Sequence, residues 1–397
     1  MRPMIRVLFG VSLGLSVLSA CSNGGGGAPV ATGGSGGVRA GGAGGGRVGG
    51  AGGVAGGGGM TTTGMGGTGG NTAGDAGDAG ARGGAGGSAI TDGAASDRAE
   101  LADMAVDRGG EDAVAAGPVT PVLRNGRWVF EAAGITFEVD PQVGGRVTAF
   151  GFTGANLLTD ATVNMENWGS TFWTSPQSVW NWPPPPQIDN LPYMVESNSN
   201  ALVLVGMQSP ALGVSVGKTF TMDRADGTVR LTYKITNHRT AALSVAPWEV
   251  TRVPNRGLSF FPTGPSLMRS PGATLPTTNM GGITWFAYNA TDIRMDSKIY
   301  ADALEGWLAW ADRDAVFIKK FVDVPAAMLA PMQGDVEIYT NMARTYIELE
   351  NQGAYTRLAP QASLTWMVTW YLKRLPAGVA VTAGNPALAD FVRTTIR

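Results

Sequence analysis

The sequence predicts an all-β fold, a large antiparallel β-sandwich, that follows a disordered glycine-rich tether. From about residue 118 to the end, short runs alternate apolar and polar residues with a period of two, as in VRLTYKITN and LTWMVTWYLK. Turn signals such as DPQVGG, RADGT and NQG separate these runs. About fifteen strands with short turns are typical of a large sandwich of two sheets.

The N-terminus indicates export. Arg2 and Arg6 precede an apolar stretch that ends in LSAC at Cys21. A basic start, a short apolar run and small residues before the cut describe a secretory signal peptide over residues 1–20. The run is shorter than the ~20 apolar residues of a membrane-spanning helix. An ordinary signal peptide with an incidental cysteine is one interpretation.

The alternative is a lipid anchor. Residues 18–21 resemble a bacterial lipobox, which implies cleavage before Cys21 and lipidation of its thiol. Cys21 is the only cysteine, so no disulfide explains it. Ser22 follows, and resemblance to Gram-negative lipoproteins then implies a lipid-anchored protein of the cell envelope, at the outer membrane or the cell surface.

Residues 21–117 are predicted to be the lipidated cysteine and a flexible linker. Most of the 60 glycines lie here, with almost no large apolar side chains. Such a segment cannot bury a core. A coil of ~95 residues spans about 55 Å on average, which is enough to lift the domain at residues 118–397 clear of lipid headgroups.

Charge and motif content exclude several function classes. The formal net charge is −2, without a basic cluster, which argues against nucleic acid and against docking on anionic lipid. The chain contains no G-x-S-x-G, H-E-x-x-H or Cys/His cluster, so we predict no metal site and no cofactor. We expect a monomer.

The individual elements follow from the same pattern. Trp366 and Trp370 share one face of LTWMVTWYLK and are expected in the core. The best helical window is residues 322–332, between Pro325 and Pro331. Strands are expected at residues 135–139, 146–152, 201–207, 229–237, 283–289, 315–322, 336–341 and 364–373.

Three stretches carry a family resemblance. FEVDPQVGGRVTAFGFTGANLL, VRLTYKITNHRTAALSVAPWEVTRV and RTYIELENQGAYTRLAPQASLTWMVTWYL resemble the opening, central and closing strands of galactose mutarotase-like domains. With GSTFWTSPQSVWNWPPP, they resemble an uncharacterised branch of that superfamily, a domain of unknown function in bacterial envelope proteins. The resemblance covers nearly all of residues 125–375. It implies a β-supersandwich with a carbohydrate site in the cleft of one sheet.

The resemblance also implies candidate catalytic residues. Aldose epimerases use a glutamate in a Leu-Glu-x-Gln context as general base, and residues 349–352 match it at Glu350. Glu348 lies two residues earlier on the same strand face, and two such carboxylates can separate each other's pKa values. The alternative is a solvated strand face on which Arg344 balances the two glutamates.

The residue that serves aldose epimerases as general acid, alongside the glutamate base, has no match in this chain. His238 is the only histidine, and it falls in a turn. Where epimerases carry the acid on the next strand, this chain has Trp248 and Glu249. Glu249 or Glu348 is therefore the candidate acid, with Tyr346 and Lys319 or Lys320 as further options, since carboxylate pairs suffice for glycoside chemistry.

The segment STFWTSPQSVWNWPPPP predicts a binding loop. Trp173, Trp180 and Trp182 present faces that suit the apolar side of a pyranose, Gln177 can bond hydroxyls, and the proline run stiffens the loop. Alternatively, the rings plug one mouth of the sandwich. We expect at least one ring in the core and at least one in the cleft. Trp248 and Arg252 complete the predicted substrate-binding set.

Three functions remain open on the sequence alone. The first is a membrane-tethered carbohydrate-binding lipoprotein. The second is a carbohydrate-active enzyme, an epimerase or a glycoside-processing enzyme, that uses Glu350 with a second carboxylate. The third is an envelope protein whose fold serves protein contacts only.

Overall fold

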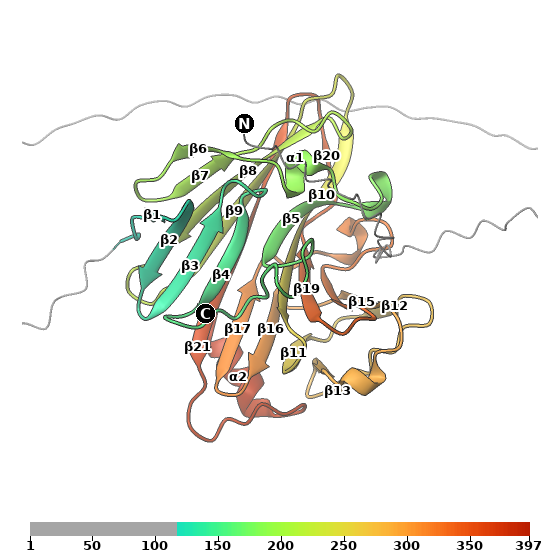
Figure 1. The fold of residues 1–397 in the computed structure, drawn as a ribbon. Coiled ribbons are helices and arrows are strands. Elements are labelled where there is room, and N and C mark those ends of the chain that lie inside the picture. The colour runs from blue at the N-terminus through green and yellow to red at the C-terminus, as the bar shows by residue number, and fades with distance from the viewer. Residues whose placement is uncertain (1–116) are drawn as a thin grey trace, which may run out of the picture. The chain divides into compact units, whose positions relative to one another are not determined.

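The computed structural model describes residues 117–397, which form two antiparallel sheets and two short α-helices (Figure 1). The predicted signal peptide, Cys21 and nearly all of the predicted linker lie outside the described residues. In the described part, no helix is long and apolar enough to cross a membrane.

The first sheet has eleven strands, in the order β1-β2-β3-β4-β5-β10-β19-β18-β15-β12, and β20 pairs with β10 beside this path. The strands are β1 Val122–Arg124, β2 Arg127–Ala132, β3 Ile135–Asp140, β4 Arg146–Phe152, β5 Ser170–Ser175, β10 Leu243–Pro254, β12 Ser266–Arg269, β15 Ser297–Asp302, β18 Val336–Thr340, β19 Tyr346–Gln352 and β20 Thr356–Leu358.

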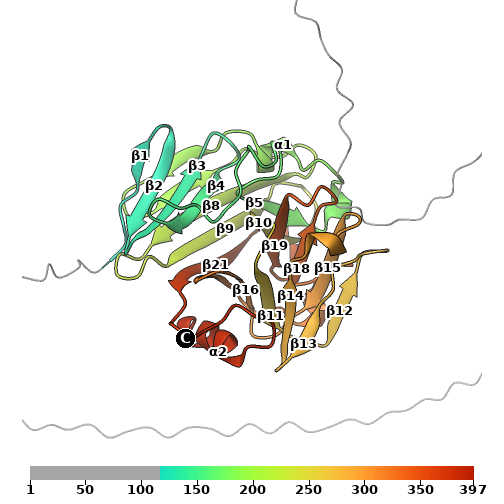
Figure 2. The same ribbon diagram turned by 60° about the horizontal axis from the view of Figure 1, so that its bottom comes forward.

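The second sheet has ten strands, in the order β13-β14-β11-β16-β17-β21-β9-β8-β7-β6. They are β6 Met194–Ser197, β7 Leu202–Val205, β8 Val214–Met222, β9 Val229–Asn237, β11 Leu258–Pro262, β13 Thr278–Met280, β14 Ile283–Ala287, β16 Trp307–Asp312, β17 Ala315–Lys320 and β21 Ser363–Arg374. Helix α2 (Pro386–Thr395) lies beside this sheet (Figure 2). The short helix α1 (Pro186–Asp189) and the 3₁₀ turns Gln177–Val179, Ala290–Asp292 and Ala326–Met328 complete the described elements.

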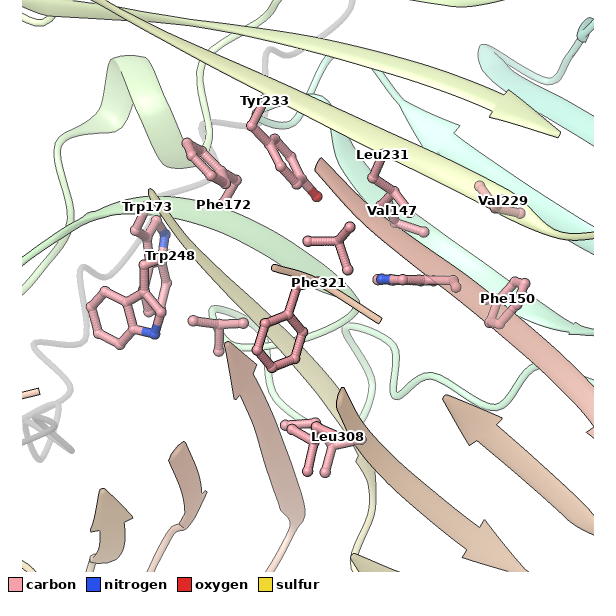
Figure 3. Close-up of a cluster of buried hydrophobic side chains, with 14 of the residues drawn as sticks. Val147, Phe150, Phe172, Trp173, Val229, Leu231, Tyr233, Trp248, Leu308 and Phe321 are labelled. Atoms are coloured by element: carbon pink, nitrogen blue, oxygen red, sulfur yellow. The ribbon is translucent and has the colours of Figure 1, made fainter. Parts of the chain in front are cut away.

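The core lies between the two sheets. Along β9, alternate residues are fully buried, so Leu231 and Tyr233 face the first sheet while their neighbours are exposed or half-buried. Figure 3 shows Leu231 and Tyr233 with Phe172 and Val147 of the first sheet. Aromatic rings from the two sheets pack against each other here: the ring centroids of Phe150 and Trp370 are 5.3 Å apart.

The predicted all-β sandwich is confirmed, and each expected strand is present, shortened in places by up to three residues. Trp366 and Trp370 are buried as expected. The helical window at residues 322–332 is wrong, because prolines at both ends limit it to a single 3₁₀ turn. Helix α2 was not predicted, although Asn385 caps it and Pro386 begins it.

A small second core explains α2. Leu388 and Val392 pack on Trp307 and Ile318, which project from the face of the second sheet that points away from the first. This face would otherwise expose large apolar side chains. The helix therefore completes the sandwich on one side.

Candidate functional site

The two faces of β10 have different environments. Glu249 and Thr251 point to the second sheet, where the Lys319 ammonium contacts both side chains at 3.0 Å. Successive residues of a strand project from opposite faces. Trp248 and Arg252 therefore project from the face of the first sheet that points away from the second, which we call the outer face.

Charged residues collect on this outer face. Arg252 lies opposite Glu348 in the register of β10 and β19. Glu350, two residues farther along β19, lies opposite Glu337 of β18. Lys298 of β15 contacts both Glu337 and Glu350. We name this group the acid cluster; it consists of Glu337, Glu348, Glu350, Lys298 and Arg252.

The acid cluster has one more carboxylate than it has cations. Lys298 Nζ lies 2.6 Å from Oε2 of Glu337 and 2.7 Å from Oε2 of Glu350. Arg252 Nε donates to Oε1 of Glu348 at 2.9 Å. All five side chains are at most 5% exposed. Three carboxylates buried with two cations favour the uptake of a proton.

The pKa values place this proton near neutral pH. Burial raises the pKa of Glu337 to about 8, with repulsion from Glu350 adding to the rise and Lys298 opposing it. Burial also raises the pKa of Glu348 to about 7, and Arg252 limits the increase. A protonated carboxyl group therefore lies beside a carboxylate at neutral pH, an arrangement that suits acid–base chemistry.

Two carboxylate oxygens are left without a donor. Oε1 of Glu350 and Oε2 of Glu348 are buried and accept no hydrogen bond from residues 117–397. Buried acceptors are nearly always paired in native proteins. Gln352 Oε1, on the same face of β19, is a third buried acceptor without a donor among the described residues.

Four tryptophans lie next to the acid cluster. Trp173 and Trp248 are opposite each other on β5 and β10, with ring centroids 5.2 Å apart (Figure 3). Trp180 and Trp182 pack edge-to-face on Trp173, at 6.0 and 5.8 Å. Trp173 and Trp248 are fully buried, whereas Trp180 and Trp182 are half-buried. We call these four side chains the tryptophan cluster.

The tryptophan cluster and the acid cluster are in direct contact. Trp248 Nε1 donates to Oε2 of Glu350 at 2.8 Å. Lys298 Nζ lies 4.7 Å from the centroid of the Trp248 ring. The Arg252 guanidinium lies 5.1 Å from the Trp173 ring. The two clusters thus form one continuous patch of aromatic and charged groups.

Hydrogen bonds and an ion pair hold the segment that carries Trp173, Trp180 and Trp182 in place. Asp189, which ends α1 after the proline run, accepts from Trp173 Nε1 at 2.7 Å and pairs with Arg146 at 3.3 Å. Trp180 Nε1 donates to the carbonyl of Thr174 at 2.8 Å. These bonds fix the orientation of the rings before any ligand arrives, which lowers the entropy cost of binding.

The structure does not bring Glu249 together with Glu350. Glu249 lies between the sheets, where it pairs with Lys319 and accepts from Tyr233 at 2.6 Å and from Trp370 at 3.0 Å. The expected pairing of Glu249 with Glu350 therefore has to be corrected. Glu249 is one position from Trp248 and three from Arg252 along β10, and residues an odd number of positions apart project from opposite faces. Glu348 is the predicted partner that does share a face with Glu350.

Arg344 and Gln177 are placed differently from expectation, whereas His238 lies in the turn where it was expected. Arg344 lies in a turn before β19 and donates to the carbonyl of Ile293, so it does not balance the glutamates; Arg252 and Lys298 do so instead. His238 follows the end of β9 and contacts Ser215 Oγ of β8 at 2.7 Å, so it lies at the second sheet, whereas β19 belongs to the first. Gln177 is buried in the 3₁₀ turn beside β5.

Sequence reasoning missed Glu337 and Lys298. Glu337 lies between buried Val336 and Ile338 in VEIYT, and a charged residue flanked by apolar ones on a buried strand is the signal that could have identified it. Lys298 lies between Ser297 and Ile299 in SKIYAD, where this signal is absent on one side. Within residues 117–397, no group of three or more His, Cys, Asp or Glu side chains is arranged to hold a metal ion.

Solved structures with a similar arrangement of strands include galactose mutarotase-like and aldose 1-epimerase-like proteins. A galactose mutarotase-like protein from Clostridium acetobutylicum is 10% identical, with 63% of this chain and 95% of that chain covered and a TM-score of 0.44. A putative aldose 1-epimerase from Escherichia coli K12 is 13% identical, with 63% and 99% covered and a TM-score of 0.41.

A TPR-domain containing protein from Parabacteroides distasonis is 11% identical, with a TM-score of 0.46; the match spans 65% of this chain and 49% of that protein. No curated protein matches the sequence. Likeness at these identities and TM-scores carries no information on activity or substrate.

The chain belongs to the family described as Domain of unknown function (DUF4380), whose model matches residues 127–373. The match includes β5, β10, β18 and β19, and so contains both the tryptophan cluster and the acid cluster.

Proposed function

We propose that this protein binds carbohydrate on the outer face of the eleven-stranded sheet, where the tryptophan cluster meets the acid cluster. The observation that carries the proposal is the direct bond from Trp248 to Glu350, which joins the two clusters. Aromatic rings offer an apolar surface to one side of a sugar ring, and adjacent carboxylates accept bonds from its hydroxyls.

The exposure of the side chains suggests an order of contact. Trp180 and Trp182 are half-buried and are therefore the rings that a sugar meets first. Glu348 and Glu350 have almost no exposed surface. A ligand therefore reaches the acceptors Oε1 of Glu350 and Oε2 of Glu348 only when this face opens.

A second candidate function is catalysis on a sugar. It is favoured by the raised pKa of Glu337 and Glu348, which keeps a proton next to Glu350 near neutral pH. In this version Glu350 acts as the base and Glu348 or Glu337 as the acid. Anomer exchange of free sugars, followed by NMR, decides between the two: equal rates with the wild type and with Glu350→Gln remove the enzymatic version.

We also propose that the protein is anchored in the cell envelope by a lipid on Cys21, at the outer membrane or the cell surface. The LSAC motif after a short apolar run supports this anchor. More than one acyl chain is needed for stable attachment. Mass spectrometry of the N-terminal peptide should show acyl mass that is lost in Cys21→Ala; an unmodified cysteine in the mature protein contradicts the anchor.

Carbohydrate binding is tested with a glycan array followed by calorimetry. Trp180→Ala removes a half-buried ring from the proposed site, and Trp128→Ala is the matched control because Trp128 is a half-buried tryptophan on β2. We expect the first variant to weaken binding by about two- to tenfold and the second to leave it unchanged, since an aromatic contact contributes on the order of 0.5–1.5 kcal/mol. Equal affinities contradict the proposed site.

A further inference from the structure

A separate polar hollow lies at the β12 edge of the eleven-stranded sheet. It has a volume of about 420 Å³ and is lined by residues 273–277 together with Arg269, Asp292 and Arg294. Arg269 ends β12, whereas Arg294 lies shortly before β15, which is the strand that pairs with β12. The pairing of these strands therefore brings two guanidinium groups to one hollow.

Within residues 117–397, neither guanidinium group forms an ion pair. Arg269 donates to the carbonyl of Leu275 at 3.4 Å and to Thr277 Oγ1 at 2.7 Å, both of which are uncharged acceptors. No carboxylate of residues 117–397 forms an ion pair with Arg269 or with Arg294. The Asp292 carboxylate also lines the hollow, so its lining carries a net charge of one positive unit.

Hydroxyl groups supply further donors. Thr274 and Thr277 both line the hollow. Thr277 Oγ1 already accepts from Arg269, and Thr274 Oγ1 accepts from the backbone N–H of Arg294 at 3.4 Å, so the hydroxyl hydrogen of each remains free to be donated. Guanidinium and hydroxyl donors around a common space are the usual partners of an oxyanion.

The segment that carries these threonines is attached to β15. Ser270 N donates to the carbonyl of Lys298 at 2.9 Å, and Lys298 N donates to Ser270 Oγ at 3.0 Å. Thr274 N donates to Ser297 Oγ at 3.3 Å. These bonds, one between backbone groups and two from backbone N–H groups to serine hydroxyls, hold the segment in place without a ligand.

We propose that this hollow binds an oxyanion group, a sulfate, phosphate or carboxylate, held by Arg269 and Arg294. The ligand is either a free inorganic anion or an acidic sugar unit of a glycan. The site is distinct from the acid cluster, whose side chains lie on β10, β15, β18 and β19 and are at most 5% exposed. It does not depend on whether the acid cluster binds sugar.

The test uses the full chain and the variant Arg294→Gln. The Arg294 side chain donates no hydrogen bond to residues 117–397 and is exposed, so the substitution leaves the fold intact. Arg357→Gln, at an exposed position on β20, is the matched control. Sodium sulfate is titrated against sodium chloride at constant ionic strength and followed by thermal melting, and a sulfated oligosaccharide is compared with its unsulfated counterpart by calorimetry.

We expect the wild type and Arg357→Gln to bind the sulfated oligosaccharide, and Arg294→Gln to bind it about ten- to a hundredfold more weakly, as for the loss of one charged hydrogen-bonding partner. General stabilisation by sulfate is the same in all three proteins and cancels in the comparison. If sulfate alone binds as tightly as the oligosaccharide, the ligand is a free anion; if the oligosaccharide binds more tightly, it is a glycan. Equal affinities of Arg294→Gln and the wild type, or no response to either probe, overturn the proposal.

Discussion

Replacing Glu337 with glutamine should stabilise the protein at alkaline pH. The acid cluster holds three carboxylates against two cations, and Glu337 is fully buried. Glu337→Gln removes the excess negative charge and leaves Lys298 paired with Glu350 at 2.7 Å. The variant therefore has two carboxylates and two cations in the same space. The substitution also puts an amide nitrogen where an oxygen accepts from Gly334 N and Gln352 Nε2 or pairs with Lys298, and this lost acceptor reduces the gain.

The magnitude follows from the pKa of Glu337. Burial raises it from 4.5 to about 8, so the folded state holds a proton that the unfolded state releases between these values. Stability consequently falls as the pH rises from about 4.5 to 8. At about 1.4 kcal/mol per pKa unit, the ceiling is roughly 5 kcal/mol, and sharing of the proton with Glu348 and Glu350 reduces the expected gain to about 2 kcal/mol.

The assay is urea unfolding at pH 5 and pH 8, followed by tryptophan fluorescence. Glu196→Gln, on the exposed edge strand β6, is the control and should behave like the wild type. The variant should be more stable than the wild type at pH 8 and nearly equal to it at pH 5. If Glu337→Gln is less stable than the wild type at pH 8, or keeps the full pH dependence, the charge balance described for the cluster is refuted.

Three further predictions concern buried cations. Lys319→Met should destabilise the protein by about 3–5 kcal/mol in urea unfolding, because Glu249 loses its ion pair between the sheets. The control Lys320→Met, at a half-buried neighbour, should cost less than about 1 kcal/mol. Equal losses of stability in the two variants argue against the buried pair. Burial lowers the pKa of Lys218 to about 7, so the folded state binds fewer protons than the unfolded state from pH 7 to 10. The free energy of unfolding should therefore rise with pH in this window. Lys218→Met should reduce that rise, and an unchanged dependence of stability on pH contradicts the prediction. Arg252→Met should cost about 3–5 kcal/mol at pH 8 and less at pH 5, where Glu348 is protonated; a loss that is independent of pH in the same unfolding assay counts against the ion pair.

Much of the fold follows from period-two patterns. The strands at residues 229–237 and 363–374 have the alternation that the sequence shows, and their apolar faces form the core. The strands of the acid cluster are different, because β19 is buried along its whole length. Alternation alone cannot tell which face of such a strand points to the second sheet.

The candidate site was only partly predictable for the same reason. The context of Glu350 and the tryptophan-rich loop identified five of the side chains that meet on the outer face: Glu348, Glu350, Trp173, Trp180 and Trp182. Trp248 and Arg252, which were predicted to bind substrate, also lie on this face, but Glu249, which was grouped with them, projects from the opposite face of β10. Lys298 and Glu337 meet this group only through the pairing of β15, β18 and β19, which no local pattern encodes.

The crystal structure of the protein soaked with the best-binding sugar from the glycan array tests the central proposal most directly. The account predicts a sugar ring on Trp180 or Trp182, with a hydroxyl within hydrogen-bonding distance of Oε1 of Glu350. A sugar bound elsewhere, with the tryptophan cluster and the acid cluster unchanged and untouched, contradicts it.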